Sequence, residues 1–310
     1  MNTPHDTEKN ILDDIELGLG AWAWGDRVVW QYGRGYGAED VRGAFETSVA
    51  EGIRLIDTAE VYGSGRSERF LGEFAQGRGN EVLVATKFFP WPWRLSRKSI
   101  PSALKAGLAR LGLEKVDLYQ IHSPTSPLKP ETMAEALVDC VDAGLTRAVG
   151  VSNFDEGQML RAYSTLARHN IGLASNQVHF SLLQREVEKN GLLARCKELG
   201  IRLMAYSPLE MGLLTGKYGR AHLPPGSRAL RYASLVARLP SLLKLMTEIG
   251  QDLGGKSNAQ VALNWVIAKG ALPIPGAKNA EQALENAGAL GWSLHADEVA
   301  ALDAVSDEIA

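Results

Sequence analysis

The chain has 310 residues, of which 45% are hydrophobic and 22% are charged, as in an ordinary globular protein. Its net charge of −3 gives no basic field for nucleic acid, and no run approaches the roughly 20 apolar residues of a membrane span. Two cysteines without metal-ligand spacing, Cys140 and Cys196, and a polar start without an apolar leader favour a reducing cytoplasm without disulfides.

Short apolar runs alternate with longer amphipathic segments, which is typical of βα units around a parallel sheet. The runs expected to be strands are 17–21, 53–56, 82–86, 116–121, 147–151, 173–178, 201–205 and 272–275. The segments expected to be helices are 38–51, 67–74, 100–111, 131–143, 187–199, 259–268 and 296–309. We therefore predict an α/β fold with one domain over residues 1–310: a (β/α)8 TIM barrel with extra loops at its C-terminal rim and a C-terminal helix.

One connection is much longer than the usual loop between a strand and the next helix. It runs from Leu209 to about Tyr232 and contains the stretch Leu223-Pro224-Pro225-Gly226-Ser227, which cannot continue a helix. Long ordered loops are often functional. We expect residues 212–232 of this segment to be a lid with few apolar residues to bury.

Four chemically active side chains lie at or just past the ends of three successive expected strands. Asp57 follows the second run, and Tyr62 lies five residues later on a Gly-rich turn. Lys87 follows the third run and His122 the fourth. Each residue alone would more often be a cap, a solvated charge, a packing aromatic or a structural histidine. Together, in this order and spacing, they resemble the catalytic tetrad of the aldo-keto reductases, whose members share the barrel fold.

The resemblance implies reduction of an aldehyde or ketone to an alcohol. Hydride delivered to a carbonyl carbon leaves negative charge on oxygen, which needs a proton and a hydrogen-bond donor. A free phenol has a pKa of about 10, so we expect the Lys87 ammonium to lower the pKa of Tyr62, the general acid. Asp57 is expected to hold Lys87 in its charged form, and His122 to donate to the developing oxyanion.

Motifs in the second half of the chain resemble the family's site for NADPH or NADP+. Gly150 to Phe154 resembles the GVSN motif that holds the nicotinamide carboxamide, and the aromatic at 206 matches the one that stacks on the nicotinamide ring. Ser207-Pro208-Leu209 and the stretch 212–217 resemble the segment that lines the pyrophosphate, where amides and a lysine suit phosphate. The expected cofactor-binding residues are Ala21, Trp22, Asp57, Ser152, Asn153, Gln177, Tyr206, Ser207, Pro208, Leu209, Lys217, Gly276, Lys278, Gln282, Glu285 and Asn286.

The expected preference for NADPH over NADH is based on one lysine of the sequence. Many family members hold the 2′-phosphate with a Lys-Ser pair and a later Arg, whereas this chain has Gly276-Ala277 and Gln282 at those places. Lys278 is the remaining cation nearby, with a solvated surface lysine as the alternative. We expect NADPH, with two arginines of the long loop, Arg228 and Arg231, as the next candidates.

The expected partner is a small carbonyl compound, with no nucleic acid and no membrane. Aromatic residues after the first and third runs are expected to form a substrate wall, although some must be core: Trp22, Trp24, Trp30, Phe88, Phe89, Trp91 and Trp93. The sequence names neither the substrate nor the oligomeric state.

Two other functions are compatible with the same residues. The first is a cofactor-binding regulatory subunit resembling the potassium-channel β subunits, which also retain the four catalytic types; a stable complex with a membrane partner would favour it over fast turnover. The second is a metal-dependent hydrolase using Asp57 and His122. The chain has no dinucleotide fingerprint and no phosphate-binding P-loop. Its histidines show no HxxxH spacing, so we expect no metal.

Overall fold

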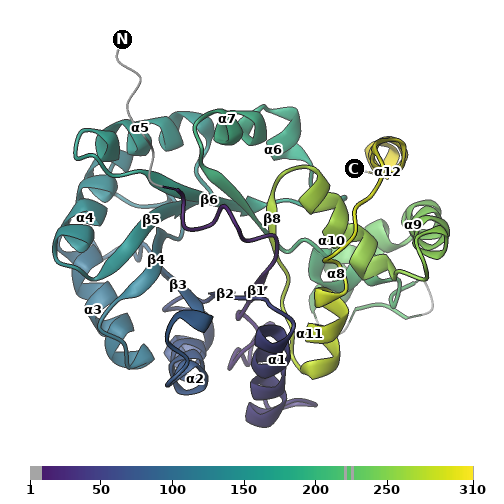
Figure 1. The fold of residues 1–310 in the computed structure, drawn as a ribbon, viewed down its shortest axis with the longest axis horizontal. Helices are drawn as coiled ribbons and strands as arrows, with labels where there is room; N and C mark the ends of the chain where they lie inside the picture. The colour runs from purple at the N-terminus through teal and green to yellow at the C-terminus, as the bar shows by residue number, and fades with distance from the viewer. Residues whose placement is uncertain (1–8, 220–221, 225–226, 310) are drawn as a thin grey trace.

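Eight parallel strands, hydrogen-bonded in chain order, form the centre of the molecule in a computed structural model that describes residues 9–219, 222–224 and 227–309 (Figure 1). A parallel bridge between Gly20 and Gly276 joins the last strand to the first and closes the barrel. The expected strands are confirmed, with ends shifted by at most two residues. They are β1 (Gly18–Gly20), β2 (Leu55–Asp57), β3 (Leu83–Phe88), β4 (Val116–Ile121), β5 (Thr146–Ser152), β6 (Leu173–His179), β7 (Arg202–Tyr206) and β8 (Leu272–Ile274).

Helices surround this barrel, and none of those described is both long and apolar enough to cross a membrane. They are α1 (Ala38–Ala50), α2 (Arg66–Ala75), α3 (Ser99–Leu111), α4 (Pro130–Asp142), α5 (Glu156–Ala167), α6 (Glu186–Lys189), α7 (Leu192–Glu198), α8 (Ser227–Val236), α9 (Pro240–Asp252), α10 (Asn258–Ala268), α11 (Ala280–Ala287) and α12 (Ala296–Ile309). Three short 3-10 helices add to them: η1 (Tyr62–Gly65), η2 (Gly79–Glu81) and η3 (Glu210–Thr215).

Four of these helices were not predicted from the sequence, and two others were predicted as one continuous helix. The four without a prediction are α5, α8, α9 and α11. The expected helix 187–199 is divided into α6 and α7 at Gly191, whose φ of 85° lies in the left-handed region that ends helices. The predicted C-terminal helix is confirmed as α12, which packs on α9 at the outside of the barrel (Figure 1).

The barrel interior is apolar at its N-terminal end. Leu12 and Ile15, from the segment before β1, pack there against side chains of the strands. Asn10 holds this segment in place by donating to Ala174 O at 2.8 Å and to Gly200 O at 3.2 Å. Because this end of the barrel is filled, the opposite end, where the strands' C-termini lie, is left for polar chemistry.

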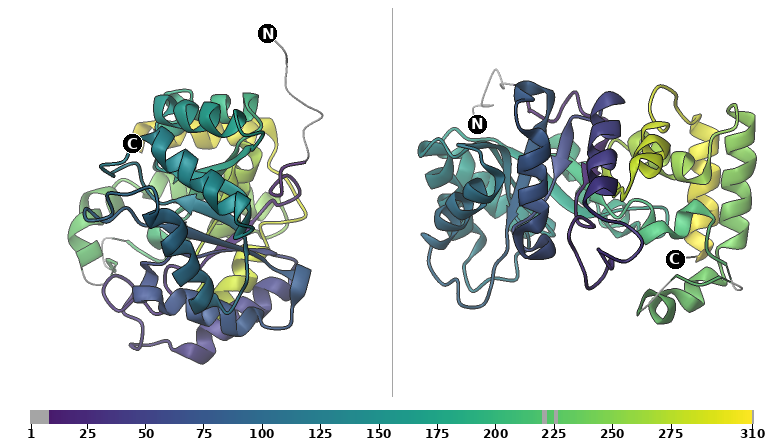
Figure 2. Two further views of the ribbon diagram at one scale, coloured as in Figure 1. Left: turned by 90° about the vertical axis from the view of Figure 1, so that its left-hand side faces the viewer. Right: turned by 90° about the horizontal axis from the view of Figure 1, so that it is seen from below.

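The long connection after β7 is folded and buries apolar side chains, which corrects the expectation that it has few of them to bury. It contains η3, a bridge between Gly219 and His222, and α8. Leu213 and Leu214 are fully buried, because the turn ahead of them directs both into the core. In the right-hand view of Figure 2, α8 in green and the dark purple loop between β1 and α1 project from the same side of the barrel.

Candidate active site

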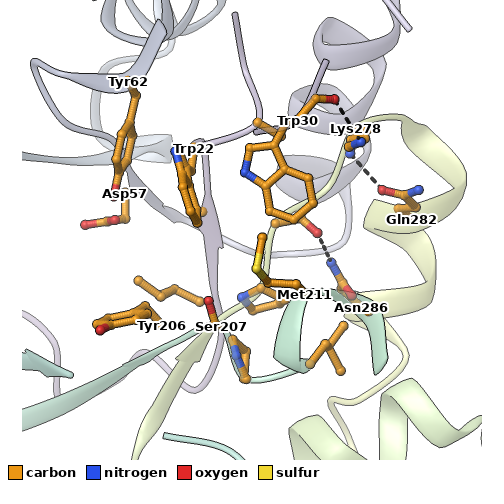
Figure 3. A pocket seen from close by; sticks show the side chains of 18 of the residues that line it. Trp22, Trp30, Asp57, Tyr62, Tyr206, Ser207, Met211, Lys278, Gln282 and Asn286 are labelled. Carbon is orange, nitrogen blue, oxygen red and sulfur yellow. Dashed lines mark hydrogen bonds between the residues drawn. The ribbon is translucent and has the colours of Figure 1, made fainter. Parts of the chain in front are cut away.

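A cleft of about 530 Å³ lies at the C-terminal ends of the strands, lined by residues from most of the loops there (Figure 3). The expected cofactor residues line it, with the exception of Ala21. That residue is fully buried, and its N–H donates to Asp57 O at 2.8 Å, so it supports the site from beneath. Lys87 likewise lies under the cleft surface, whereas Asp57, Tyr62 and His122 line it.

The Lys87 ammonium is the centre of the predicted tetrad. It pairs with the Asp57 carboxylate and donates to Thr58 O at 2.9 Å and to the Tyr62 hydroxyl at 3.4 Å. The side chains of Lys87 and Asp57 are both almost completely buried. An ion pair held this way is screened little by solvent, so the charge acts strongly on the neighbouring phenol.

Two glutamines that sequence reasoning did not place in this role hold Asp57 from across the barrel. Gln120 on β4 and Gln177 on β6 donate to Asp57 Oδ1 at 3.2 and 2.9 Å. Gln120 is a fully buried polar residue inside an expected strand, and a polar residue at an inward-facing position is the signal that could have marked it. Asp57 therefore connects strands β2, β3, β4 and β6 through side chains.

The turn that carries Tyr62 depends on glycine. Gly63 has a φ of 55°, and a Cβ there would lie 2.7 Å from the backbone of Gly25 in the β1–α1 loop. Ser64 and Gly65 also have positive φ, at 57° and 82°. Only glycine fits the close approach at position 63 without a shift of backbone. The glycines of this stretch thus shape the turn that carries Tyr62.

The pKa of Tyr62 differs in direction from the sequence expectation. Burial raises it above 10, Asp57 adds to the rise, and Lys87 lowers it through charge and hydrogen bonding without reversing the net direction. Lys87 has the predicted effect, but desolvation of the partly buried phenol outweighs it. For Lys87 itself, burial lowers the pKa, yet Asp57 and Tyr62 bring it above its usual value, so the ammonium remains charged.

His122 is a neutral imidazole in this site. Burial, with a further contribution from the Lys87 charge, lowers its pKa from 6.5 to about 3. Its ring lies 5.7 Å from the ring of Tyr62 and 5.4 Å from that of Phe89, measured between centroids. Its Nδ1 is buried and has no hydrogen-bond partner in the protein. A neutral imidazole still carries one N–H to donate to a carbonyl oxygen.

Beyond the tetrad, a set of polar side chains is fixed by mutual hydrogen bonds. Asn153, with a φ of 60°, donates to His122 O at 3.0 Å and accepts from the Tyr206 hydroxyl at 3.0 Å. Ser152 donates to Gln177 O at 2.7 Å. The Tyr206 ring lines the cleft and is stacked on His179, with centroids 5.2 Å apart and planes at 16°. A planar ring entering the cleft therefore meets a rigid aromatic surface.

The segment after β7 has the backbone shape of an anion cradle. Ser207, Glu210 and Met211 have φ between 46° and 51°, and Gly212 has φ 94°. A Cβ on Gly212 would lie 3.0 Å from Lys217 Cε and 3.2 Å from its Nζ, so a side chain there would crowd the ammonium. The bare backbone and the adjacent cation fit the pyrophosphate of a dinucleotide. Met211 and Tyr218 were not predicted as lining residues, because nothing in the sequence fixes this turn.

At the far end of the cleft, Lys278, Gln282 and Asn286 lie together (Figure 3), and Glu285 is also part of the lining. The backbone N–H of Lys278 donates to Gln282 Oε1 at 3.0 Å, which fixes the backbone at this position. The side chains of the reserve candidates, Arg228 and Arg231, lie outside the described part of the chain.

The aromatic wall is smaller than expected. Trp22, Trp30 and Phe89 line the cleft, whereas Trp24 and Phe88 are fully buried core residues. The other two expected members, Trp91 and Trp93, do not line the cleft. Their rings are stacked on each other, with centroids 5.1 Å apart. Within the described ranges, no three His, Cys, Asp or Glu side chains are grouped as metal ligands.

Comparison with known proteins assigns this site to a family. The model of the aldo/keto reductase family matches residues 16–307. The chain belongs to the aldo/keto reductase family. It is 41% identical to "Pyridoxal reductase, chloroplastic" of Arabidopsis thaliana, over 94% of this chain and 83% of the relative, and 32% identical to "L-glyceraldehyde 3-phosphate reductase" of Escherichia coli K12, over 88% and 83%.

A solved aldo/keto reductase of Klebsiella pneumoniae, in complex with NADP and acetate, superimposes with a TM-score of 0.75 at 27% identity, covering 94% of this chain and 91% of the other. The resemblance and the barrel fold predicted from the sequence are therefore confirmed. This aldo/keto reductase is an oxidoreductase that uses NADP(H) to reduce a carbonyl compound, and the regulatory-subunit alternative is not favoured.

Proposed function

We propose that Tyr62 protonates the carbonyl oxygen while His122 donates a hydrogen bond to it. Bound NADPH supplies the hydride. The position of the Tyr62 hydroxyl, 3.4 Å from the buried Lys87 ammonium and beside a neutral imidazole, carries this assignment. Lys87 favours the phenolate that remains after proton donation, and Asp57 keeps Lys87 charged and in place. Gln177, Ser152 and Asn153 orient the nicotinamide end, and Tyr206 supplies the surface on which that ring stacks.

Tyr62→Phe is the direct test, because it removes the acidic proton and keeps the ring. Turnover should fall by roughly the 10²–10⁴-fold typical of losing a general acid. NADPH affinity should stay near that of the natural protein, since the hydroxyl serves the substrate. Tyr163→Phe, on α5 and away from the cleft, is the matched control and should turn over normally. Near-normal turnover in Tyr62→Phe would overturn the assignment.

We further propose a planar aromatic aldehyde as substrate, with pyridoxal as the first candidate. The relative named for pyridoxal reduction is 41% identical to this chain over 305 aligned residues. Trp22 lies against Tyr62 and Phe89 against His122 in the lining of the cleft, and flat apolar walls favour a flat ring. The relative named for a phosphorylated aliphatic aldehyde is more distant, at 32%.

Phe89→Ala distinguishes the two substrate types. Phe89 lies edge-on to His122, so its loss should lower kcat/KM for pyridoxal about 2- to 10-fold more than for glyceraldehyde, the range of one aromatic contact. Equal losses for both aldehydes would contradict an aromatic substrate. A screen in which glyceraldehyde is turned over faster than pyridoxal by the natural protein would also do so.

We also infer that the chain is one domain that works in a reducing compartment such as the cytoplasm. Cys140 and Cys196 are both buried and unbridged. Burial raises the pKa of each thiol to about 12, so both are poor nucleophiles. A single urea transition by both fluorescence and circular dichroism, and a cytoplasmic fluorescent fusion, are the expected results. Two separated unfolding transitions would contradict the single domain. A fusion found outside the cytoplasm would contradict the inferred compartment.

A further inference from the structure

The Lys278 ammonium is held in an aromatic seat built by a loop far away in sequence. Its Nζ lies 4.5 Å from the ring centroid of Tyr36 and 4.9 Å from that of Trp30, and it donates to Trp30 O at 3.4 Å. Both distances are within the range of a cation–π contact. Figure 3 shows Trp30 between Trp22 and Lys278, so Trp30 lies between the part of the cleft near Tyr62 and the far end that carries Lys278.

The loop that carries the seat, residues 22–37, is ordered by its own contacts. Asp26 Oδ1 accepts from the N–H groups of Val29 and Trp30 at 2.7 and 3.1 Å. The Tyr36 hydroxyl donates to Ala23 O at 2.8 Å. The Trp24 indole donates to Ala277 O at 3.0 Å, next to Lys278. The two rings are therefore fixed relative to the segment after β8 before any ligand arrives.

Aromatic rings position an ammonium differently from a carboxylate. A ring face attracts the cation through its quadrupole and leaves the full positive charge available to an anion. Burial raises the pKa of Tyr36 above its usual value, so this residue contributes a neutral ring. A lysine held in this way has lost part of its side-chain freedom, so less entropy is lost when it binds phosphate.

We propose that Trp30 and Tyr36 determine the preference for NADPH by holding Lys278 where the 2′-phosphate binds. The β1–α1 loop is then part of the cofactor-recognition site, although it contributes no charge to it. This inference rests on the proposed role of Lys278. It adds that the selectivity of that lysine depends on two aromatic residues about 240 positions earlier in the chain.

The test compares two cofactor fragments in calorimetric titrations. Adenosine 2′,5′-bisphosphate carries the 2′-phosphate and adenosine 5′-monophosphate lacks it, and neither has a nicotinamide. Fragments are needed because Trp30 also meets Trp22, at 5.6 Å between centroids, near the catalytic end. Lys278→Met should lower the preference for the bisphosphate about 10- to 150-fold. Trp30→Leu keeps the backbone carbonyl and should lower it about 2- to 5-fold.

The double variant decides whether Trp30 acts through Lys278. If it does, Lys278→Met with Trp30→Leu should be no worse than Lys278→Met alone, and Trp30→Phe, which restores a ring, should recover most of the preference. Trp292→Leu is the matched control, because Trp292 forms a similar contact with Lys256, at 5.3 Å, away from the cleft. It should leave the preference unchanged.

The role of Lys278 and the role of its aromatic seat are refuted by different results. An unchanged preference in Lys278→Met would remove Lys278 from the 2′-phosphate site, and the proposal with it. A loss in Lys278→Met with none in Trp30→Leu and Tyr36→Leu would keep the lysine and overturn the aromatic seat. Additive losses in the double variant would also overturn it, since Trp30 would then act independently of Lys278.

Discussion

Acid should destabilise the cofactor-free protein through His122. In the unfolded chain this imidazole binds a proton near pH 6.5, whereas in the folded protein burial and Lys87 lower its pKa to about 3. Between these two values the unfolded state binds more protons than the folded state. The free energy of unfolding contributed by neutral His122 is therefore complete above pH 6.5 and is lost as the pH falls toward 3.

The size of the effect follows from this difference. One extra proton in the unfolded state changes the free energy of unfolding by about 1.4 kcal/mol per pH unit, so the loss from His122 should reach about 2 kcal/mol at pH 5. His122→Gln removes the titration and keeps a neutral side chain with a hydrogen-bond donor. The variant should lose less stability than the natural protein over the same pH range.

Urea unfolding at pH 7, 6 and 5 measures both proteins. The difference between their free energies of unfolding should change by about 2 kcal/mol from pH 7 to pH 5, because the other titrating groups are common to both and cancel. His295→Gln, at an exposed position, should follow the natural protein. Curves that fall in parallel for His122→Gln and the natural protein would refute the reasoning.

Three other predictions follow from the charged groups and loops of the cleft. Lys87→Met leaves the buried Asp57 carboxylate without its cation and should cost about 3–5 kcal/mol in urea unfolding, besides abolishing turnover; a stable variant would mean that Asp57 becomes protonated. Lys217→Ala should weaken NADPH and NADH equally in direct titrations, since both have the pyrophosphate, and a loss confined to NADPH would place this lysine elsewhere. The lid remains a prediction: hydrogen exchange of residues 212–219 should slow when NADPH binds, and unchanged exchange would exclude closure.

The strand ends were predictable because apolar runs in a parallel barrel stop where polar chemistry begins. Asp57, Lys87 and His122 could be aligned on one rim from this alone, before any coordinates. The helices missed, α5, α8, α9 and α11, are at least as amphipathic as the predicted helices α1, α10 and α12, so their pattern was present in the sequence and was overlooked. The helix α5 is an instructive case, since Asp155 and Gln158 form a capping box that the sequence already contained.

The electrostatics and the long-range contacts of the site could not be predicted from the sequence. The direction of the Tyr62 pKa depends on how completely the phenol is buried, which the sequence does not state. The seat of Lys278 joins two loops from opposite ends of the chain, and no spacing rule links position 278 with positions 30 and 36. Both properties arise only when the barrel closes between β1 and β8.

The hydrogen bonds of Asp57 have a consequence for anyone who redesigns this barrel. A single carboxylate accepts from Lys87, Gln120 and Gln177, which belong to three different strands. Replacing it would disturb the scaffold and the chemistry at once, and an inactive variant could not be attributed to either. A catalytically silent protein that still carries its cofactor should instead be made at Tyr62, which sits on a rim turn and whose hydroxyl contacts only the Lys87 ammonium among the hydrogen bonds described above.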